Sequence, residues 1–253
     1  MMETRISNAN QEVIIGGGRP TVLIGERINP TGRKKLAETM RSGDLDAVRR
    51  DAVAQVKAGA AVIDVNAGVP GVNEVELFPK VVQVVMEAVD VPLSLDSPNP
   101  EALTAALKVY KGKPLINSVT GEESSMQTVL PLAKEYGAAV VALLQGDGGI
   151  APDPEGRVAV ARKLIDRADS IGIPIEDLVV DFLSDLNGDL GTVSVNINTG
   201  DVTLNWTANL YDQIEILRDT VLIDTVAGTD TTYTDPGLAA GNYTYQVQGV
   251  CTG

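Results

Sequence analysis

The strongest constraint on the fold is an alternation of short apolar runs with helical segments over the first 181 residues. The apolar runs are TVLIGE (21–26), AVIDVN (61–66), PLSLD (92–96), PLINS (114–118), AAVVALL (138–144) and LVVD (178–181). Helical spacing of apolar residues fills the stretches between them, at 44–59, 74–89, 99–109, 123–136 and 155–171. Near-continuous apolar strands that alternate with helices are typical of a parallel sheet covered by helices.

The spacing of these strands favours one α/β architecture over another. A strand recurs about every 25–40 residues, and no Rossmann glycine fingerprint follows the first strand, which favours a (β/α) TIM-barrel-type fold. A doubly wound parallel sheet is the alternative that the pattern leaves open. The apolar share of 44% is ample for a core of either kind.

Polar side chains stand at or just beyond the end of most predicted strands. In chain order they are Glu26, Asn29, Asp64, Asn66, Asp96, Asn117 and Asp181. In a parallel barrel these positions share one rim, the face on which barrel enzymes carry their sites. Carboxylates and carboxamides that face one another in an apolar cavity can hydrogen-bond to the donors and acceptors along the edge of a flat heterocycle. The alternative is that they cap helices or form turns, which is equally credible for each residue alone but weaker for the set.

Composition excludes several classes of chemistry. The chain has no histidine, which removes Ser-His, Cys-His and His-ligated metal mechanisms, and its single cysteine, Cys251, allows neither a disulfide framework nor a cysteine metal cluster. We therefore expect no metal site. A net charge of −14 disfavours nucleic acid and anionic membranes as partners. No signal peptide or membrane-spanning apolar run is visible, so we expect a cytoplasmic protein.

Five segments carry a resemblance to a known family. They are IGERINPTGRKK (24–35), IDVNAG (63–68), LSLDS (93–97), INSVTGEE (116–123) and LVVD (178–181). In order and spacing they resemble the pterin-binding barrels, and in particular the methyltetrahydrofolate:corrinoid methyltransferases. The resemblance implies that Asp96, Asn117 and Asp181 hold the pterin ring. Dihydropteroate synthase shares that fold and is a further alternative, but its N-x-T-P-D-S-F type loop after the first strand is absent from GERINPTG.

The resemblance also implies a reaction. Methyltetrahydrofolate is the substrate, its N5 methyl group passes to cobalt(I), and cobalamin enters only through a partner corrinoid protein. The N5 amine leaves readily only when it gains positive charge by protonation or hydrogen bonding in the transition state, which requires neither histidine nor a metal ligand. No catalytic residue is assigned. The resemblance implies a homodimer as well.

The likeness to the family stops after LVVD. The family continues with a seventh and an eighth strand, and an asparagine after the seventh strand assists at N5; neither has a counterpart in this sequence. We therefore expect a barrel that ends after its sixth strand and doubt full activity of the chain. The competing interpretation is a non-catalytic binding or structural fusion protein.

We take residues 1–187 as the incomplete pterin-binding barrel domain. Residues 188–253 differ from it in composition and in the spacing of their apolar residues. This segment contains one basic residue, Arg218, against eight acids, and its apolar residues repeat every second position. It resembles a fibronectin type III β-sandwich without its last strand. The resemblance rests on Trp206 and on L-x-x-G-x-Y-x-Y-x-V at 238–247, in which Tyr243 matches the tyrosine-corner residue. Such a module implies an interaction surface, and we expect the chain to be a fusion or truncated gene product.

A short basic run follows the first predicted strand. Arg33, Lys34 and Lys35 fit a solvated helix start. The alternative is that they meet the glutamate tail of a folate.

Overall fold

The chain separates into two compact units, Met1–Phe182 and Leu183–Gly253. The computed structural model describes residues 2–151, 154–181, 189–197, 200–205, 213–219, 221–227, 230, 232–239 and 241–250. The division falls five residues before the boundary that composition predicts.

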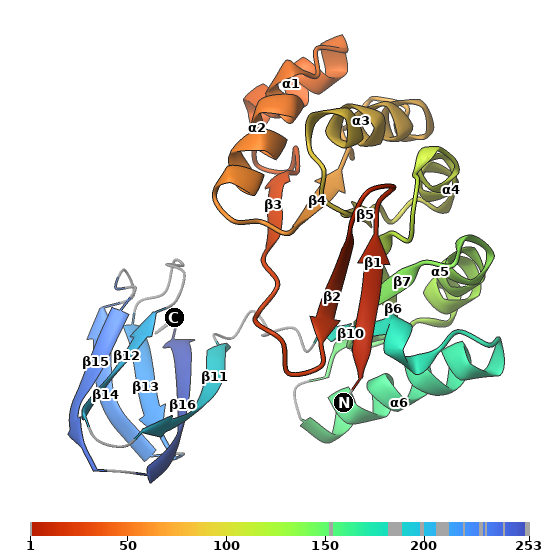
Figure 1. Ribbon diagram of the computed structural model, residues 1–253. Coiled ribbons are helices and arrows are strands. Elements are labelled where there is room, and N and C mark those ends of the chain that lie inside the picture. Colours follow the sequence, from red (N-terminus) through yellow and green to blue (C-terminus); the bar gives the residue numbers. More distant parts are fainter. Residues whose placement is uncertain are drawn as a thin grey trace. The chain divides into compact units, whose positions relative to one another are not determined.

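A parallel sheet forms the centre of the first unit (Figure 1). Its order is β10-β7-β6-β5-β4-β3, so β3 and β10 are the edge strands. The strands are β3 (Ile24–Ile28), β4 (Val62–Asn66), β5 (Leu93–Asp96), β6 (Leu115–Thr120), β7 (Ala139–Leu143) and β10 (Leu178–Asp181). All five pairings are parallel, which confirms the predicted α/β architecture. The first strand begins three residues later than expected, because its pairing with β4 starts at Ile24.

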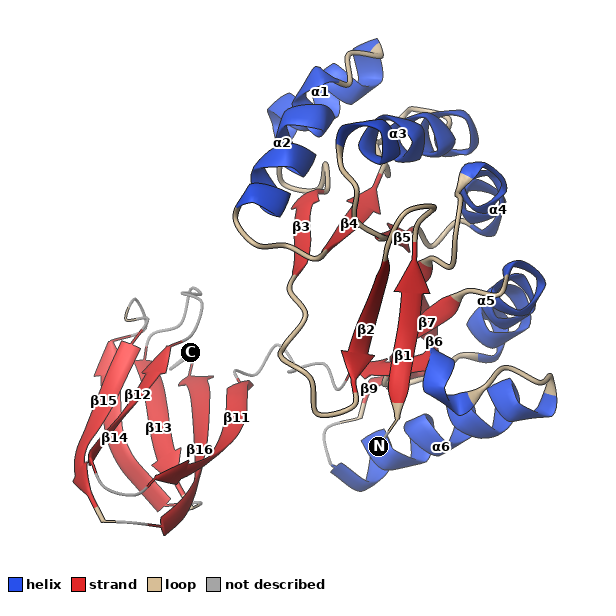
Figure 2. Cartoon of the chain, in the orientation of Figure 1, coloured by secondary structure: helices blue, strands red, loops and turns tan. Residues whose placement is uncertain are grey.

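Helices cover the outer face of this sheet (Figure 2). They are α1 (Lys34–Ser42), α2 (Asp46–Lys57), α3 (Glu74–Ala88), α4 (Pro100–Val109), α5 (Glu123–Tyr136) and α6 (Pro154–Ser170), with a 3-10 helix η1 (Ile175–Asp177) before β10. Strand residues such as Ile63, Leu95 and Val140 pack with buried helix residues in one core. The side chains of Asn73 and Asn99 accept from backbone N–H groups at the starts of α3 and α4, and Pro100 begins α4. These caps explain where the two helices start.

An antiparallel hairpin, which the sequence analysis did not predict, packs on the inner face. It comprises β1 (Glu3–Ser7) and β2 (Glu12–Gly16). Ile6 is fully buried against Val62, Leu115 and Ala139, the first residues of β4, β6 and β7. The hairpin therefore closes the amino end of the inner face. Since side chains alternate along a strand, the polar residues of β4 that lie two and four positions after Val62 share this face.

The loop after β7 contains a second, shorter hairpin of β8 (Gln145–Gly146) and β9 (Gly149–Ile150). The backbone N–H of Gly121 donates to the carbonyl of Gln145 at 2.7 Å, which joins this hairpin to the loop after β6. No helix in the described part of the chain is both long and apolar enough to cross a membrane.

The second unit contains antiparallel strands. One sheet has the order β11-β16-β13-β14, and β12 pairs with β15. The strands are β11 (Asp189–Ile197), β12 (Gly200–Asn205), β13 (Gln213–Arg218), β14 (Val221–Ala227), β15 (Thr232–Leu238) and β16 (Gly241–Val250). The Tyr243 hydroxyl donates to the carbonyl of Ala239 at 3.2 Å, a contact of the tyrosine-corner kind. Trp206 and Cys251 lie outside the described residues, and the fibronectin type III assignment stays a prediction.

Candidate functional site

The polar residues at the carboxyl ends of β4, β5 and β6 are neighbours in the sheet. Asp64 pairs in register with Ser94, Asn66 with Asp96, and Asp96 with Asn117. They lie on the inner face, which the hairpin closes at its amino end. The register therefore brings together four of the predicted site residues: Asp64, Asn66, Asp96 and Asn117.

Asp64 forms the deeper part of this cluster. Its side chain is 4% exposed. One carboxylate oxygen, Oδ1, accepts from the Ser94 hydroxyl at 2.6 Å and from Nδ2 of Asn117 at 3.1 Å. The two donors offset part of the desolvation of the buried carboxylate. The contact with Asp64 also orients the amide of Asn117, with its nitrogen towards the carboxylate.

Asp96 forms the outer part. Its Oδ2 accepts from Nδ2 of Asn66 at 2.9 Å, and Oδ1 of Asn66 in turn accepts from the backbone N–H of Gly68 at 2.9 Å. Asn66 thus orients the carboxylate of Asp96 through its hydrogen bond and is itself held by the backbone of Gly68. Nearby, the hydroxyl of Ser97 donates to Glu74 at 2.7 Å.

Burial sets the protonation behaviour of both aspartates. It raises the pKa of Asp64 to about 6; the hydrogen bond from Ser94 opposes this shift, and the charge of Asp96 adds to it. Burial also raises the pKa of Asp96, against the hydrogen bond from Asn66, and the charge of Glu74 adds to that shift. Among the described residues, no lysine or arginine donates a hydrogen bond to either carboxyl group.

A cavity of about 570 Å³ opens beside this cluster. Asp96 and Asn117 line it, together with Glu122 and the hydroxyl-bearing side chains Ser97, Ser118, Thr120, Ser124, Ser125 and Thr128. Among the described residues, no lysine or arginine lines it. Such a lining suits a neutral ligand that is rich in N–H donors, because each carboxylate or carbonyl oxygen can accept from it.

The remaining predicted site residues lie apart from the cluster. Glu26 on β3 is exposed, although its charge helps to raise the pKa of Asp64. Asp181 is exposed at the end of the other edge strand, β10. Asn29 forms a turn, because its Oδ1 accepts from the backbone N–H of Thr31 at 2.9 Å.

Sequence reasoning missed three side chains that support the cluster: Ser94, Ser97 and Glu74. Ser94 had a detectable signal, since it stands two residues before Asp96 and side chains at that spacing share one face of a strand. No sequence pattern pointed to Glu74, because it lies on α3 and reaches Ser97 only through tertiary packing.

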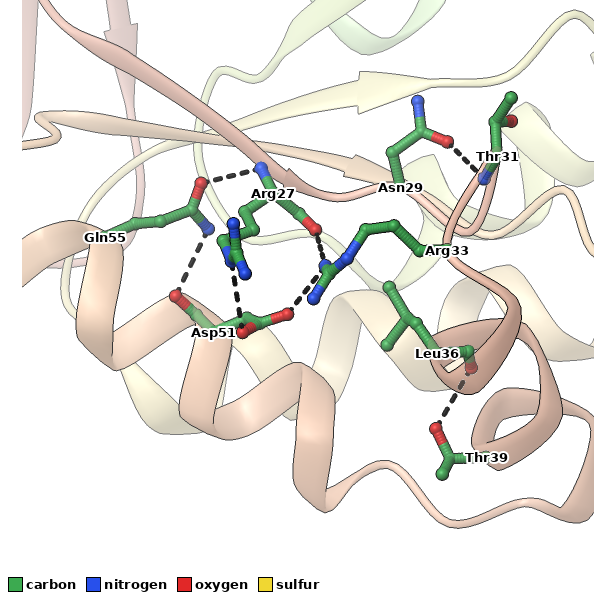
Figure 3. A network of polar contacts seen from close by, with 8 residues as sticks. All are labelled: Arg27, Asn29, Thr31, Arg33, Leu36, Thr39, Asp51 and Gln55. Atoms are coloured by element: carbon green, nitrogen blue, oxygen red, sulfur yellow. Dashed lines mark hydrogen bonds and ion pairs between the residues drawn. The ribbon is translucent and has the colours of Figure 1, made fainter.

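A polar network fixes the loop after β3 (Figure 3). The guanidinium of Arg33 contacts Asp51 on α2 at 2.8 Å and donates to the carbonyl of Arg27. The side chain of Gln55 accepts from the backbone N–H of Arg27 at 2.7 Å. These contacts hold the start of α1 against α2, beside the rim.

Fold and site together define a (β/α) barrel-type protein with a cluster of carboxylates and carboxamides at the carboxyl ends of its strands. The family model described as "Pterin binding enzyme" matches residues 25–193. The chain belongs to this family.

Two relatives with assigned names are similar to this chain in sequence. The chain is 35% identical over 152 residues to the methylcorrinoid:tetrahydrofolate methyltransferase of Eubacterium limosum, covering 58% of this chain and 55% of that protein. It is 33% identical over 173 residues to the methionine synthase of Mycobacterium leprae (strain TN), covering 66% of this chain and 14% of that protein. The chain thus spans about half of the first relative and a small part of the second. It is a pterin-binding domain related to the methyltetrahydrofolate:corrinoid methyltransferases.

Among solved structures, 7,8-dihydropteroate synthase from Vibrio fischeri ES114 matches with a TM-score of 0.51 and 20% identity. The match covers 72% of this chain and 69% of that one. At this identity the likeness concerns the fold.

Proposed function

We propose that the first unit binds a reduced pterin of the methyltetrahydrofolate type at the carboxyl ends of β4, β5 and β6. The observation that carries this proposal is the coupled pair of contacts, Asn117 on Asp64 and Asn66 on Asp96, beside the cavity of about 570 Å³. A pterin ring presents N–H and amino donors along one edge. The carboxylate and carboxamide oxygens of the cluster are the complementary acceptors.

The four residues divide into ligand-facing and orienting groups. Asp96 and Asn117 line the cavity, so they would contact the ring. Asp64 and Asn66 each hold one of them by a hydrogen bond, at 3.1 Å and 2.9 Å. Because these hydrogen bonds fix the rotamers of Asp96 and Asn117 before the ligand binds, they lower the conformational entropy lost on binding. Asp181, at the end of β10, is proposed as a further contact on the grounds of the family resemblance.

We further propose that the bound pterin exchanges its N5 methyl group with a corrinoid carried by a partner protein. The printed name of the Eubacterium limosum relative describes transfer between a methylcorrinoid and tetrahydrofolate. In either direction the N5–methyl bond breaks or forms while N5 loses or gains positive charge, so an enzyme gains rate by placing donors near N5. The role of the residues described above is to bind and orient the pterin for that step.

Calorimetric titration of the full chain with methyltetrahydrofolate tests the proposal. We expect saturable heat at one site per chain. A chain that is folded by circular dichroism and gives no heat of binding favours the competing interpretation, a non-catalytic binding or structural protein.

A methyl-transfer assay with free cobalamin(I) in place of the corrinoid protein then separates binding from catalysis. A chain that binds methyltetrahydrofolate and fails to methylate cobalamin is a pterin-binding domain alone.

A further inference from the structure

The segment from the last residue of β5 to the first residue of α4 forms part of the wall of the cavity of about 570 Å³. Asp96, Ser97, Pro98 and Pro100 all line the cavity. The two prolines fix the backbone φ angle at their positions, which stiffens this loop. Since the loop begins at Asp96, the groups that hold it from behind also decide where this carboxylate stands.

The hydroxyl of Ser97 anchors the loop. Ser97 is 3% exposed, and its oxygen accepts from the backbone N–H of Asn99 at 3.1 Å. A hydroxyl has a single proton to donate. The shorter of its two donor contacts, 2.7 Å, is to Oε1 of Glu74, and the longer, 3.5 Å, is to the carbonyl of Asn99. One buried hydroxyl therefore joins the loop to the first turn of α3.

Glu74 is the first residue of α3 and is half-buried. The N-terminus of a helix favours a negative charge, so the fold supports a carboxylate at this position. That charge also acts on Asp96. Burial raises the pKa of Asp96 and the charge of Glu74 raises it further, while the hydrogen bond from Asn66 opposes the rise.

The other charged groups around Asp96 are acids as well. Asp64 on β4 interacts with it electrostatically, and Glu122, in the loop after β6, lines the same cavity. Glu74 differs in its connection, because it is hydrogen-bonded to the loop that carries Asp96. It consequently acts on this carboxyl group both through geometry and through charge.

We infer that Glu74 is a positioning residue of the pterin site. Through Ser97 it fixes the loop that carries Asp96, and through its charge it makes pterin binding weaken at a higher pH on acidification. This inference rests on the proposed function, in which the carboxylate form of Asp96 accepts from the ring. A neighbouring negative charge favours the protonated form, so it narrows the acid side of the pH range of tight binding.

The test measures the affinity of the full chain for methyltetrahydrofolate by calorimetry from about pH 5 to pH 8. Three variants separate geometry from charge. Glu74→Gln keeps an oxygen that can accept from Ser97 and removes the charge. Ser97→Ala removes the hydrogen bond and keeps the charge, and Glu74→Ala removes both.

At the alkaline end of this range we expect Glu74→Gln to bind as tightly as the wild type. Its affinity should then fall at a lower pH than that of the wild type, because the carboxylate of Asp96 persists further into acid. Ser97→Ala should bind about three- to tenfold more weakly, and its affinity should fall at the wild-type pH. Glu74→Ala should show both changes. A tail-free reduced pterin should repeat this pattern, because the loop faces the ring.

The matched control is Glu76→Gln. Glu76 is the other acid in the first turn of α3; it is exposed, it accepts from Asn73, and it is not part of the lining of the cavity of about 570 Å³. We expect this variant to reproduce the wild-type affinity at every pH.

A wild-type pH profile for Glu74→Gln overturns the role of the charge, and wild-type affinity of both Ser97→Ala and Glu74→Ala overturns the role of the hydrogen bond. Equal changes in Glu76→Gln overturn the inference as a whole, because the effect would then be one of general charge. In each of these cases the wild type still binds, so the proposed function stands. Absence of binding by the wild type overturns the proposed function and this inference with it. Circular dichroism of every variant confirms that a loss of affinity is not a loss of fold, and Glu74→Gln, which retains the hydrogen bond, decides the role of the charge even where Ser97→Ala fails to fold.

Discussion

Asp64 keeps a carboxylate nearly out of water at the centre of the rim. Burial raises its pKa from an ordinary 3.8 to about 6, although the hydrogen bonds from Ser94 and Asn117 oppose the shift. A carboxyl group whose pKa rises on folding binds more protons in the native state. Its stabilising contribution is therefore complete below about pH 4 and is lost as pH rises through 6.

Replacing Asp64 by Asn should consequently stabilise the protein at neutral pH. The Asn keeps an oxygen that accepts from Ser94 and Asn117 and removes the buried charge. We expect the free energy of unfolding to rise by up to about 3 kcal/mol at pH 7 and to change little near pH 4. Urea denaturation of both proteins at the two pH values measures this; a difference that is independent of pH contradicts the account of Asp64.

Asp96→Asn tests whether Asp96 contacts the pterin ring. The substitution replaces a carboxylate acceptor by a carboxamide, so one hydrogen bond to the pterin is lost or opposed. We expect pterin binding to weaken by roughly 1–3 kcal/mol in a calorimetric titration. Asp166→Asn, at an exposed position of α6, is the matched control. Unchanged affinity of the Asp96 variant removes Asp96 from the site.

The residue types of the site were predictable, but their pairing was not. The end of each apolar strand revealed Asp64, Asp96 and Asn117, because polar groups there have no place in the apolar core. Which of them touch depends on the register between β4, β5 and β6, and register is fixed by packing across the whole sheet. The contact of Asn29 with the backbone N–H of Thr31 likewise became visible only in the structure.

Among the elements, the hairpin of β1 and β2 positions the site indirectly. It fills the amino end of the inner face and attaches to the loops there, since Thr4 donates to the carbonyl of Glu176 at 2.6 Å and the backbone N–H of Ser7 to that of Lys113 at 2.8 Å. Its strands, ETRIS and EVIIG, have only five residues each, and Ile6, Val13 and Ile15 pack in one apolar cluster with the first residues of the sheet strands. A two-stranded hairpin this short depends on such tertiary contacts, which is why sequence alone did not predict it.

Ile6→Ala tests this role of the hairpin. Ile6 is fully buried, so truncation leaves a cavity among Val62, Leu115 and Ala139. We expect a loss of about 2–5 kcal/mol in the free energy of unfolding. Ile175→Ala, at a position that is 44% exposed, should cost much less. Equal losses in the two variants in urea denaturation would show that the hairpin does not stabilise the sheet.

Over the whole molecule, the two units have separate cores. The second unit packs Leu204, Ile214, Ile216, Tyr245 and Val247, which belong to neither core of the first unit. In that core the hydroxyl of Tyr245 donates at 2.5 Å to the buried carboxylate of Asp235, which also contacts Arg218 at 2.7 Å. Separate cores predict separate unfolding transitions.

Tyr245→Phe should therefore destabilise the second unit alone. Loss of one donor to the buried Asp235 is expected to cost about 1–3 kcal/mol. Scanning calorimetry should show one transition shifted by this change and the other shifted by Ile6→Ala. A single transition that responds to both substitutions contradicts the independence of the two units.

A crystal structure of the full chain grown with methyltetrahydrofolate shows whether a pterin ring binds at the carboxyl ends of β4, β5 and β6. We expect the donor edge of the ring within hydrogen-bond distance of Asp96 and Asn117, in the cavity that these residues line. A ring bound anywhere else on the chain, with that cavity holding only solvent, would contradict it.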